Sequence, residues 1–428
     1  MPTLYKKISQ FLYLTLFPFL SLKCAINDPN KLWQGRLGKI DGQIQAKGPY
    51  DLWLQAVSVG EVNVAEAIVR ALDVIRPGLN IIISSTTPTG LARAKALFKD
   101  RCPVVPYPLD FPKPVEQSVQ IISPKIYASI ETELWPNMLE TVTKHGAKAV
   151  LLNGRISANS FKRYRLIKSA IQPILQKFTL LCAISEIYAQ RLIGLGAPKN
   201  RVTIVGNAKF EGLLKRVDPE KKQKMLQKLK ITQNDKVFVA GSLRKGEIKK
   251  IVHSIQSVKE DFPNALFILV PRHLKRVSEI AKTLRKKRLK FDLWSKLEVS
   301  QKVQNQIVLV DVIGPLFELY SIADVAFVGG SLVPKGGQNL MEPAAWSCPV
   351  LFGPYTDNFE ECSQALLKTG GGIMVSDGKG LVHHIKTLFA NPEQAKQIGF
   401  NAKKALMLLA KDAATKQAEL LLHLLEQP

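Results

Sequence analysis

The sequence predicts an α/β protein built from two doubly wound domains, each with a parallel sheet between helices. Three observations support this fold class. The chain has 428 residues, which exceeds the usual size of one domain. Short apolar runs typical of buried parallel strands alternate with amphipathic helical stretches, in two series. Polar clusters follow directly after the apolar runs, where ligands bind in sheets of this kind.

The charge of the chain indicates an anionic partner. Lys and Arg number 60 against 35 Asp and Glu, which gives a formal net charge of +25. Nucleic acid, an acidic membrane surface or a phosphorylated substrate would suit such an excess. No basic motif is interleaved with aromatic residues, so we expect no nucleic-acid partner. Five widely spaced cysteines without a Cys-x-x-Cys pair argue against a disulfide framework or a zinc site and favour a reducing compartment.

The N-terminal segment, residues 8–22, is apolar and is flanked by Lys6, Lys7 and Lys23. It is shorter than the ~20 residues that a full membrane span needs. Four interpretations stay open: a marginal anchor, an interfacial helix, a signal-peptide core, or a core helix, which Pro18 would interrupt. Because basic flanks suit the cytoplasmic face of a membrane, we expect an uncleaved anchor or interfacial segment over residues 1–25, with the rest of the protein cytoplasmic.

The first predicted domain, residues 26–209, contains seven apolar runs typical of strands. A polar or glycine-containing cluster follows each run except 104–107, and most runs are separated by helical stretches. Ligands bind beyond the carboxyl ends of strands in such sheets, so the clusters are candidate site residues. The predicted strands are 52–57, 81–85, 104–107, 126–130, 148–153, 180–184 and 202–205.

Residues 210–235 are rich in charged side chains with amphipathic spacing, so we interpret them as a helical linker. The second predicted domain covers residues 236–405, and residues 406–428 form a closing helix. The predicted strands of the second domain are 237–240, 266–270, 307–310, 325–328 and 349–353. Two doubly wound domains joined by a linker match the GT-B glycosyltransferase architecture, whose active site lies in the cleft between the domains.

The most informative stretch is 324–343, where an apolar run leads into two glycine pairs and then into Asn339-Leu340-Met341-Glu342-Pro343. We interpret it as a buried strand, a glycine loop and a helix N-terminus. Glycines let a ligand approach the backbone, and helix N-termini favour anions. Glu342 could accept hydrogen bonds from ribose hydroxyls, as in dinucleotide folds. The alternative is a plain turn, with Glu342 as a favourable charge at the helix start.

Charged residues that follow strands of the first domain are candidates for catalysis. Glu61 follows Gly60 at a helix start, where an exposed but positioned carboxylate could act as a general base; the alternative is a capping residue. Glu131 and Glu133 follow a strand and should therefore point to opposite faces, with one facing the ligand. Lys209, after Gly206-Asn207, could balance a carboxylate or an anionic substrate, although most lysines are simply solvated.

In the second domain, Arg272 and His273 follow a strand and could bind a phosphate, as could Gly241-Ser242 with Arg244. The basic run 285–290 has two interpretations that the sequence does not separate: a patch that binds a membrane or nucleic acid, and a solvated helix face. The chain lacks a phosphate-binding G-x-x-x-x-G-K-[ST] loop, an H-E-x-x-H motif, a G-x-S-x-G elbow and a D-x-D pair, so these sites are excluded.

Six motifs follow one another along the chain: Ala56–Glu61, Thr86–Gly90, Glu131–Asn137, Gly206–Phe210, Pro271–His273 and Gly329–Pro343. Taken together, they resemble the 3-deoxy-D-manno-octulosonic acid (Kdo) transferases of lipopolysaccharide assembly. The resemblance runs in order from the N-terminal segment to about residue 365.

This resemblance implies an inverting, metal-independent GT-B enzyme that needs no cofactor. Such an enzyme moves Kdo from CMP-Kdo to a tetraacylated, bisphosphorylated lipid A precursor (lipid IVA) at the cytoplasmic face of the inner membrane. Glu61 matches the family's general base, and Glu131 and Lys209 match positions that support an oxocarbenium-like transition state. The positions that match CMP contacts are Arg272, His273, Ile313, Gly314, Pro315, Asn339, Leu340, Met341 and Glu342.

The chain departs from the family pattern at three positions. Gln338 and Arg244 stand where the family has His, and Pro315 stands where it has Glu. Pro315 can neither donate an amide nor supply a carboxylate, so its contact differs from the family's. Two other functions stay open: another GT-B sugar-nucleotide transferase or epimerase, and a non-catalytic basic protein that binds a membrane surface.

Overall fold

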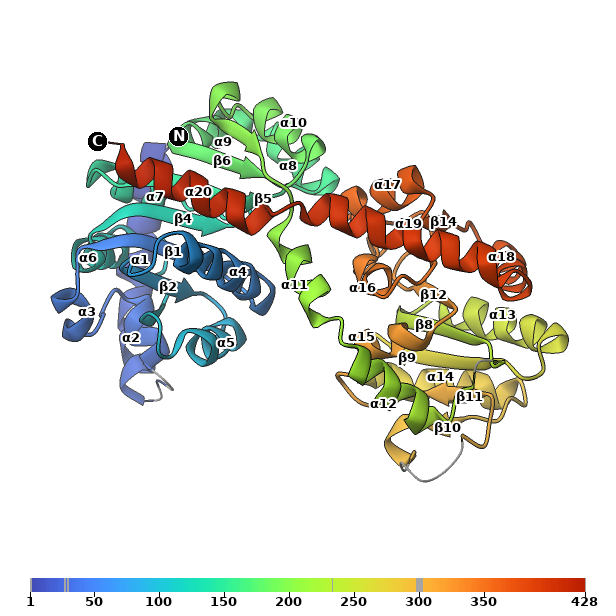
Figure 1. Ribbon diagram of the computed structural model, residues 1–428. Coiled ribbons are helices and arrows are strands. Elements are labelled where there is room, and N and C mark those ends of the chain that lie inside the picture. Colours follow the sequence, from blue (N-terminus) through green and yellow to red (C-terminus); the bar gives the residue numbers. More distant parts are fainter. Residues whose placement is uncertain (1, 27, 29–30, 233, 298–302, 428) are drawn as a thin grey trace. The chain divides into compact units, whose positions relative to one another are not determined.

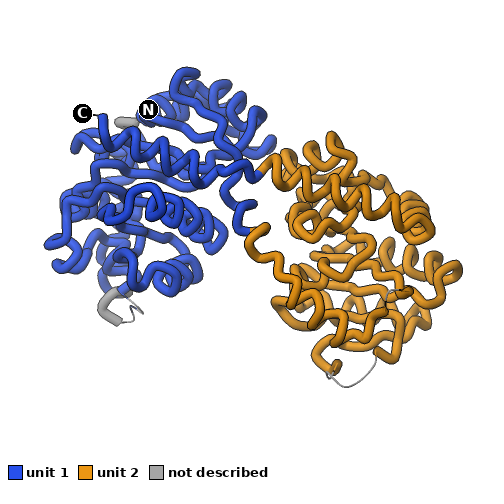
Figure 2. The backbone as a smooth tube through the Cα atoms, viewed as in Figure 1, with its two compact units in different colours: residues 1–212, 410–428 blue, residues 213–409 orange. Residues whose placement is uncertain are grey.

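The computed structural model describes residues 2–26, 28, 31–232, 234–297 and 303–427. The chain forms two compact units (Figure 2). Unit 1 comprises residues 1–212 and 410–428, and unit 2 comprises residues 213–409. The C-terminal segment therefore belongs to the same unit as the N-terminal half of the chain.

Unit 1 is built on a parallel seven-stranded sheet in the order β3-β2-β1-β4-β5-β6-β7 (Figure 1). The chain builds outward from β1 in one direction and then restarts at β4, which pairs with β1 on its other side. The junction between β1 and β4 is thus the topological switch point, where ligands bind in open parallel sheets. The strands are β1 (Tyr50–Ala56), β2 (Ile81–Ser85), β3 (Val104–Pro106), β4 (Pro124–Ile130), β5 (Lys148–Gly154), β6 (Phe178–Ala183) and β7 (Val202–Ile204).

Helices cover both faces of this sheet because side chains along each strand alternate between the faces. Leu52 and Leu54 enter one core with α4, α5 and α20, whereas Trp53 enters the opposite core with α6, α7, α9 and α10. The helices are α2 (Leu32–Arg36), α3 (Gly42–Ala46), α4 (Val59–Ile75), α5 (Pro88–Phe98), α6 (Pro112–Ile122), α7 (Pro136–Lys144), α8 (Ala158–Leu166), α9 (Lys168–Leu175), α10 (Glu186–Gly194), α11 (Ala208–Arg216) and α20 (Ala413–Glu426).

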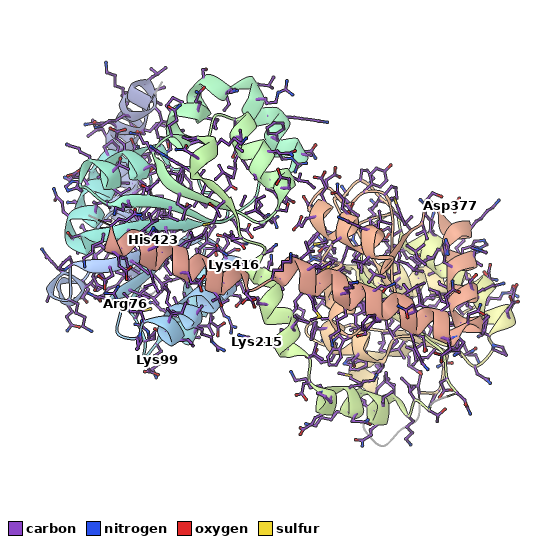
Figure 3. All side chains as sticks on the ribbon, turned by 45° about the horizontal axis from the view of Figure 1, so that its top comes forward. Arg76, Lys99, Lys215, Asp377, Lys416 and His423 are labelled. Atoms are coloured by element: carbon purple, nitrogen blue, oxygen red, sulfur yellow. The ribbon has the colours of Figure 1, made fainter. Side chains whose placement is uncertain are left out.

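The C-terminal helix α20 packs on α4 through apolar residues. Figure 3 labels Lys416 and His423 on α20 and Arg76 at the end of α4. The Arg76 guanidinium lies 3.6 Å from the carboxylate of Glu426. This packing makes α20 a structural part of unit 1.

The N-terminal helix α1 (Pro2–Ile26) docks on unit 1 through one face. Tyr13 is 6% exposed and its ring lies 5.5 Å from that of Phe111. The Asn137 amide donates to Ser9 Oγ at 3.0 Å. Pro18 lies inside the helix without ending it.

The structure does not support the prediction that residues 1–25 form a membrane anchor, if that anchor is taken to span the membrane. Among the helices that the structure describes, none is both long and apolar enough to cross a membrane. Lys6 and Lys7 precede the apolar residues 8–22, Ser9 lies within them, and one face of the helix packs on the unit.

Unit 2 has its own parallel seven-stranded sheet, in the order β10-β11-β9-β8-β12-β13-β14. Its switch point lies between β8 and β12. The strands are β8 (Val237–Leu243), β9 (Leu266–Pro271), β10 (Asp292–Leu293), β11 (Ile307–Leu309), β12 (Val325–Val328), β13 (Val350–Phe352) and β14 (Gly372–Met374).

The helices of unit 2 include α12, near the point where the chain enters this unit, and α19, where the chain leaves it. They are α12 (Pro219–Leu229), α13 (Ile248–Asp261), α14 (Val277–Lys286), α15 (Leu316–Leu319), α16 (Met341–Ala345), α17 (Glu360–Thr369), α18 (Gly378–Ala390) and α19 (Pro392–Ala410). The predicted α/β class with two doubly wound sheets is confirmed. Cys182 and Cys348 are buried in the cores of the two units.

Candidate functional site

Glu61 lies in the first turn of α4, directly beyond the carboxyl end of β1. Its carboxylate accepts hydrogen bonds from the backbone N–H of Val57 at 2.5 Å and from Ser58 Oγ at 3.0 Å. These bonds fold the side chain back over the strand end and hold it at the switch point. Thr87 fixes the same loop, because its Oγ1 donates to the Val57 carbonyl oxygen at 2.8 Å.

The electrostatic surroundings of Glu61 favour its protonated form. Burial raises the pKa of Glu61 to about 7, with smaller contributions from the negative charges of Glu131 and Glu133. The hydrogen bonds from Val57 and Ser58 act in the opposite direction and only partly offset the rise. A carboxylate with a pKa near neutrality is suited to accept a proton from a substrate hydroxyl.

Glu131 and Glu133 do not follow the strand alternation that the sequence predicts. The strand β4 ends at Ile130, and Glu131 has a left-handed backbone with φ of 60°. Both carboxylates consequently contribute to the raised pKa of Glu61. Glu131 Oε2 lies 3.6 Å from Arg155 Nε, and Glu133 accepts a hydrogen bond from the Trp135 indole at 2.7 Å.

Lys209 also lies close to Glu61, although it follows β7, the strand at one edge of the sheet. Its Nζ lies 3.4 Å from the point where a Cβ atom on Gly60 would stand, next to Glu61. Its backbone N–H donates to Asn207 Oδ1 at 3.1 Å. The structure therefore brings together Glu61, Glu131 and Lys209, the three residues that the sequence selected as catalytic candidates.

In unit 2 the glycine loop begins where β12 ends. A Cβ atom on Gly329 would lie 2.6 Å from the carbonyl oxygen of Ser242, so only glycine allows this close approach of the loops after β8 and β12. Gly330 has φ of +74°, which favours glycine. At the other end of the loop, Asn339 Oδ1 accepts from the Met341 N–H at 3.1 Å, and Asn339 Nδ2 donates to Glu342 Oε1 at 3.3 Å.

Glu247 organises this loop and was not selected from the sequence. Its side chain is 0% exposed. Its carboxylate accepts four backbone N–H bonds, from Arg244 at 2.9 Å, Gly330 at 2.7 Å, Ser331 at 3.0 Å and Leu332 at 2.9 Å. The loops on both sides of the switch point are thus tied to one carboxylate. In the sequence, Glu247 is indistinguishable from a capping residue before α13.

Cationic side chains gather at the ends of β8 and β9. Arg244 Nη1 lies 3.5 Å from His273 Nε2, and Arg272 and His273 are exposed. Desolvation and then the neighbouring cations, chiefly Arg244 and Arg272, lower the pKa of His273. This group of cations is suited to an anionic ligand.

The remaining predicted nucleotide contacts follow β11, which is paired with β9. Ile313 is 87% exposed, Gly314 has φ of +124°, and Pro315 immediately precedes α15. Together with the loops described above, they lie beyond the carboxyl ends of four adjacent strands, β11, β9, β8 and β12.

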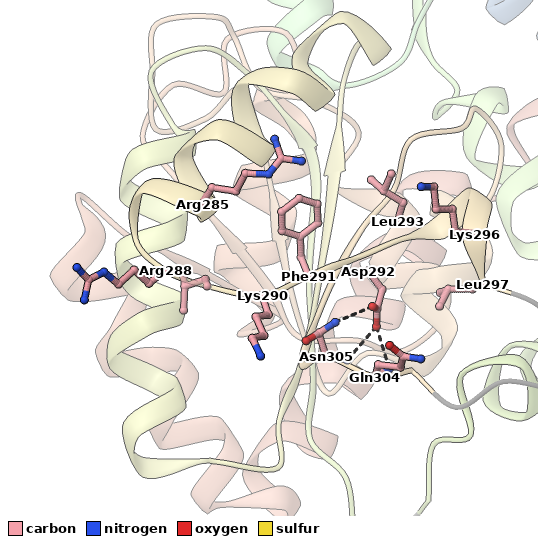
Figure 4. Close-up of a pocket in the computed structure, with 11 residues that line it drawn as sticks. Arg285, Arg288, Lys290, Phe291, Asp292, Leu293, Lys296, Leu297, Gln304 and Asn305 are labelled. Carbon is pink, nitrogen blue, oxygen red and sulfur yellow. Dashed lines mark hydrogen bonds between the residues drawn. The ribbon is translucent and has the colours of Figure 1, made fainter.

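A separate basic pocket, with a volume of about 780 Å³, is lined from the end of α14 and from β10 (Figure 4). The carboxylate of Asp292 in this pocket accepts hydrogen bonds from the backbone N–H groups of Gln304 and Asn305, both at 2.9 Å. None of the candidate site residues named above lines it.

Comparisons with known proteins agree with these observations. The family model described as 3-deoxy-D-manno-octulosonic-acid transferase (kdotransferase) matches residues 31–212. The 3-deoxy-D-manno-octulosonic acid transferase of Haemophilus influenzae is 33% identical over 392 residues, which cover 90% of each chain. A bifunctional glycosyltransferase/methyltransferase of Fusobacterium nucleatum is 37% identical over 79% of this chain, which spans only 52% of that relative.

Solved structures show the fold. The UDP-GlcNAc 2-epimerase of Neisseria meningitidis, bound to UDP-GlcNAc, has a TM-score of 0.62 at 14% identity, over 87% of this chain and 99% of its own. A glycosyltransferase of Rickettsia africae has a TM-score of 0.61 at 16% identity, over 89% of this chain and 100% of its own. The two parallel sheets match the GT-B glycosyltransferase fold. On the evidence of its sequence relatives, the chain belongs to the 3-deoxy-D-manno-octulosonic acid (Kdo) transferase family.

Proposed function

We propose that this protein transfers Kdo from CMP-Kdo to the phosphorylated lipid A precursor lipid IVA during lipopolysaccharide biosynthesis. Membership of the Kdo transferase family supports the reaction class. The observation that carries the assignment of roles is the raised pKa of Glu61, about 7, at the switch point beside Glu131 and Lys209. A positioned proton acceptor is what transfer to a hydroxyl group requires.

In the proposed reaction, Glu61 takes the proton from a hydroxyl group of the acceptor. The oxygen of that hydroxyl group attacks the anomeric carbon of Kdo at the same time. The bond between that carbon and the CMP phosphate oxygen breaks, and CMP leaves with the bonding electrons. A single displacement inverts the anomeric configuration. Glu131 stabilises the developing positive charge on the sugar, and Lys209 offers a positive charge to the carboxylate of the donor.

Unit 2 supplies the donor site in this proposal. Arg272 and Arg244 neutralise phosphate charge, and backbone N–H groups of the glycine loop approach the nucleotide. Asn339 and Glu342 bind ribose hydroxyls. At Pro315 only the carbonyl oxygen is available, so that position contributes no donated hydrogen bond. We expect neither a metal nor another cofactor to be needed, so transfer should persist in EDTA.

The acceptor is a lipid, and α1 offers an apolar face to a membrane surface. Its exposed residues include a stripe at helical spacing: Leu4 is 58% exposed, Ile8 51%, Phe11 66%, Phe19 72% and Leu22 58%. Lys6 and Lys7 lie on the same helix, which suits anionic lipids. We propose that α1 lies in the interface of the inner membrane, on the cytoplasmic face, rather than spanning it.

Competition binding tests the donor assignment, and an active-site substitution tests the base. CMP should displace a fluorescent CMP analogue at lower concentration than UDP does. Glu61→Gln should abolish transfer and retain CMP affinity. A preference for UDP would favour another GT-B sugar-nucleotide enzyme, and vesicle binding without nucleotide affinity would favour a non-catalytic membrane protein.

A further inference from the structure

A buried side chain from the C-terminal helix reaches the strand end beside Lys209. Gln417 on α20 is 0% exposed, and its Oε1 accepts a hydrogen bond from the backbone N–H of Asn153 at 2.7 Å. Its Nε2 donates to the carbonyl oxygen of Ala413 at 3.0 Å, which fixes the orientation of the amide. Gln417 and Asn153 are 264 positions apart in the chain.

The backbone of Asn153 explains why this partner is needed. The register of β5 against β6 shifts between Leu151 and Gly154, and Asn153 has a left-handed backbone with φ of 51°. An irregularity of this kind takes an N–H group out of the sheet ladder. Leaving such a buried N–H without an acceptor costs about 1–3 kcal/mol. Gln417 supplies the acceptor that the sheet does not.

The side chain of Asn153 continues the connection to Lys209. Its Oδ1 accepts from the Ala208 N–H at 3.0 Å, and its Nδ2 donates to Asn207 Oδ1 at 3.2 Å. Asn207 Oδ1 also accepts from the backbone N–H of Lys209 at 3.1 Å. Asn153 and Asn207 are 0% and 2% exposed, so water does not compete effectively for these bonds.

We propose that Gln417 is a positioning residue for Lys209, through Asn153 and Asn207. This inference rests on the proposed function, in which Lys209 acts beside Glu61. Helix α20 thereby supports the loop that carries Lys209, through the hydrogen bond between Gln417 and the backbone of Asn153. Gln417 acts through these neighbours and contributes no group that touches substrate.

Gln417→Leu tests this role, with Leu421→Ala as the matched control. Leu421 is also fully buried on α20, in the apolar core, and has no part in the hydrogen-bonded chain. Gln417→Leu should lower kcat by about tenfold, with the KM for CMP-Kdo unchanged. Leu421→Ala should lower the melting temperature and leave kcat unchanged below that temperature. Gln417→Glu, which keeps an acceptor oxygen, should restore most of the lost kcat.

Amide hydrogen exchange gives a readout that does not depend on substrate. In Gln417→Leu, the backbone amides of residues 206–210 should exchange about tenfold faster or more, and in Leu421→Ala they should not. Unchanged exchange there, or an equal loss of kcat in the two variants, would overturn the inference. A wild-type protein without transferase activity would instead refute the proposed function, while the exchange result would still decide the positioning role.

Discussion

The carboxylate of Glu247 accepts a hydrogen bond from the backbone N–H of Gly330 at 2.7 Å, between residues 83 positions apart in the chain. This contact joins the loops after β8 and β12 at the switch point of unit 2. Because the same carboxylate also binds the N–H groups of Ser331 and Leu332, the glycine loop is shaped before any ligand arrives. Preorganisation of this kind lowers the cost of binding a nucleotide.

Glu247→Gln should weaken CMP binding. A glutamine offers one acceptor oxygen, and its NH₂ group would face backbone donors, so at least one buried N–H loses its partner at a cost of about 1–3 kcal/mol. We expect the Kd for CMP to rise about tenfold or more, as measured by calorimetry. Glu393→Gln, which removes an exposed ion pair with Lys396 in the same unit, is the control and should leave the Kd unchanged. Equal affinities in all three proteins would contradict the role of Glu247.

The pH dependence of transfer should report the ionisation of Glu61. The base acts in its ionised form, so kcat/KM should fall about tenfold per pH unit below the pKa of about 7. Glu131→Gln removes a negative charge that raises this pKa, so the acid limb should move to lower pH. The shift should be partial, because burial is the larger cause. A pH–rate profile with the same acid limb in both proteins would argue against electrostatic coupling between Glu131 and Glu61.

Glu61 should also make folding stability depend on pH. Its folded pKa is raised above the usual value, so the native state binds the proton more tightly than the unfolded state does. The contribution of Glu61 to the free energy of unfolding is therefore fully present below about pH 4.5, and it is lost as the pH rises through about 7.

Glu61→Gln has no ionisable group at this position, so the variant should not lose this stability as the pH rises. At pH 8 the variant should gain up to about 3 kcal/mol in unfolding free energy over the wild type, and much less at pH 4.5. Urea denaturation at the two pH values measures the difference. A gain that is the same at both would show that the ionisation of Glu61 does not cost stability.

The apolar stripe of α1 should govern binding to vesicles. Replacing Phe11 and Phe19 with Ser removes two exposed rings without touching the packed face of the helix. Partitioning to vesicles that contain anionic lipid should fall by about tenfold or more, because each ring buries apolar area in the membrane. Val74→Ser, at an apolar residue that is 85% exposed on α4, is the control and should have no effect. Cosedimentation that is unchanged in the double variant would exclude α1 as the contact.

The sequence predicted the parts of the site that depend on local pattern. Glu61 and the glycine loop each follow an apolar strand, and strand ends meet at one edge of a parallel sheet. The strand alternation predicted for Glu131 and Glu133 was wrong, because β4 ends at Ile130 and the backbone then turns left-handed. A two-residue period applies only while the strand continues.

Contacts between distant segments were beyond local pattern. Glu247 and Gln417 bind backbone groups 83 and 264 positions away, and neither residue type nor spacing indicates such partners. For α1, hydropathy indicated an apolar segment but not which face would pack. Tyr13 and Ser9 are buried on unit 1, whereas Phe11 and Phe19 stay exposed.

Mass spectrometry of the lipid product tests the central claim most directly. The purified protein would be incubated with CMP-Kdo and the tetraacylated, bisphosphorylated lipid A precursor, in parallel with Glu61→Gln. The account predicts a lipid that carries Kdo, with release of CMP, for the wild type and no product for the variant. Unmodified lipid with the wild type, or equal product from Glu61→Gln, would contradict it.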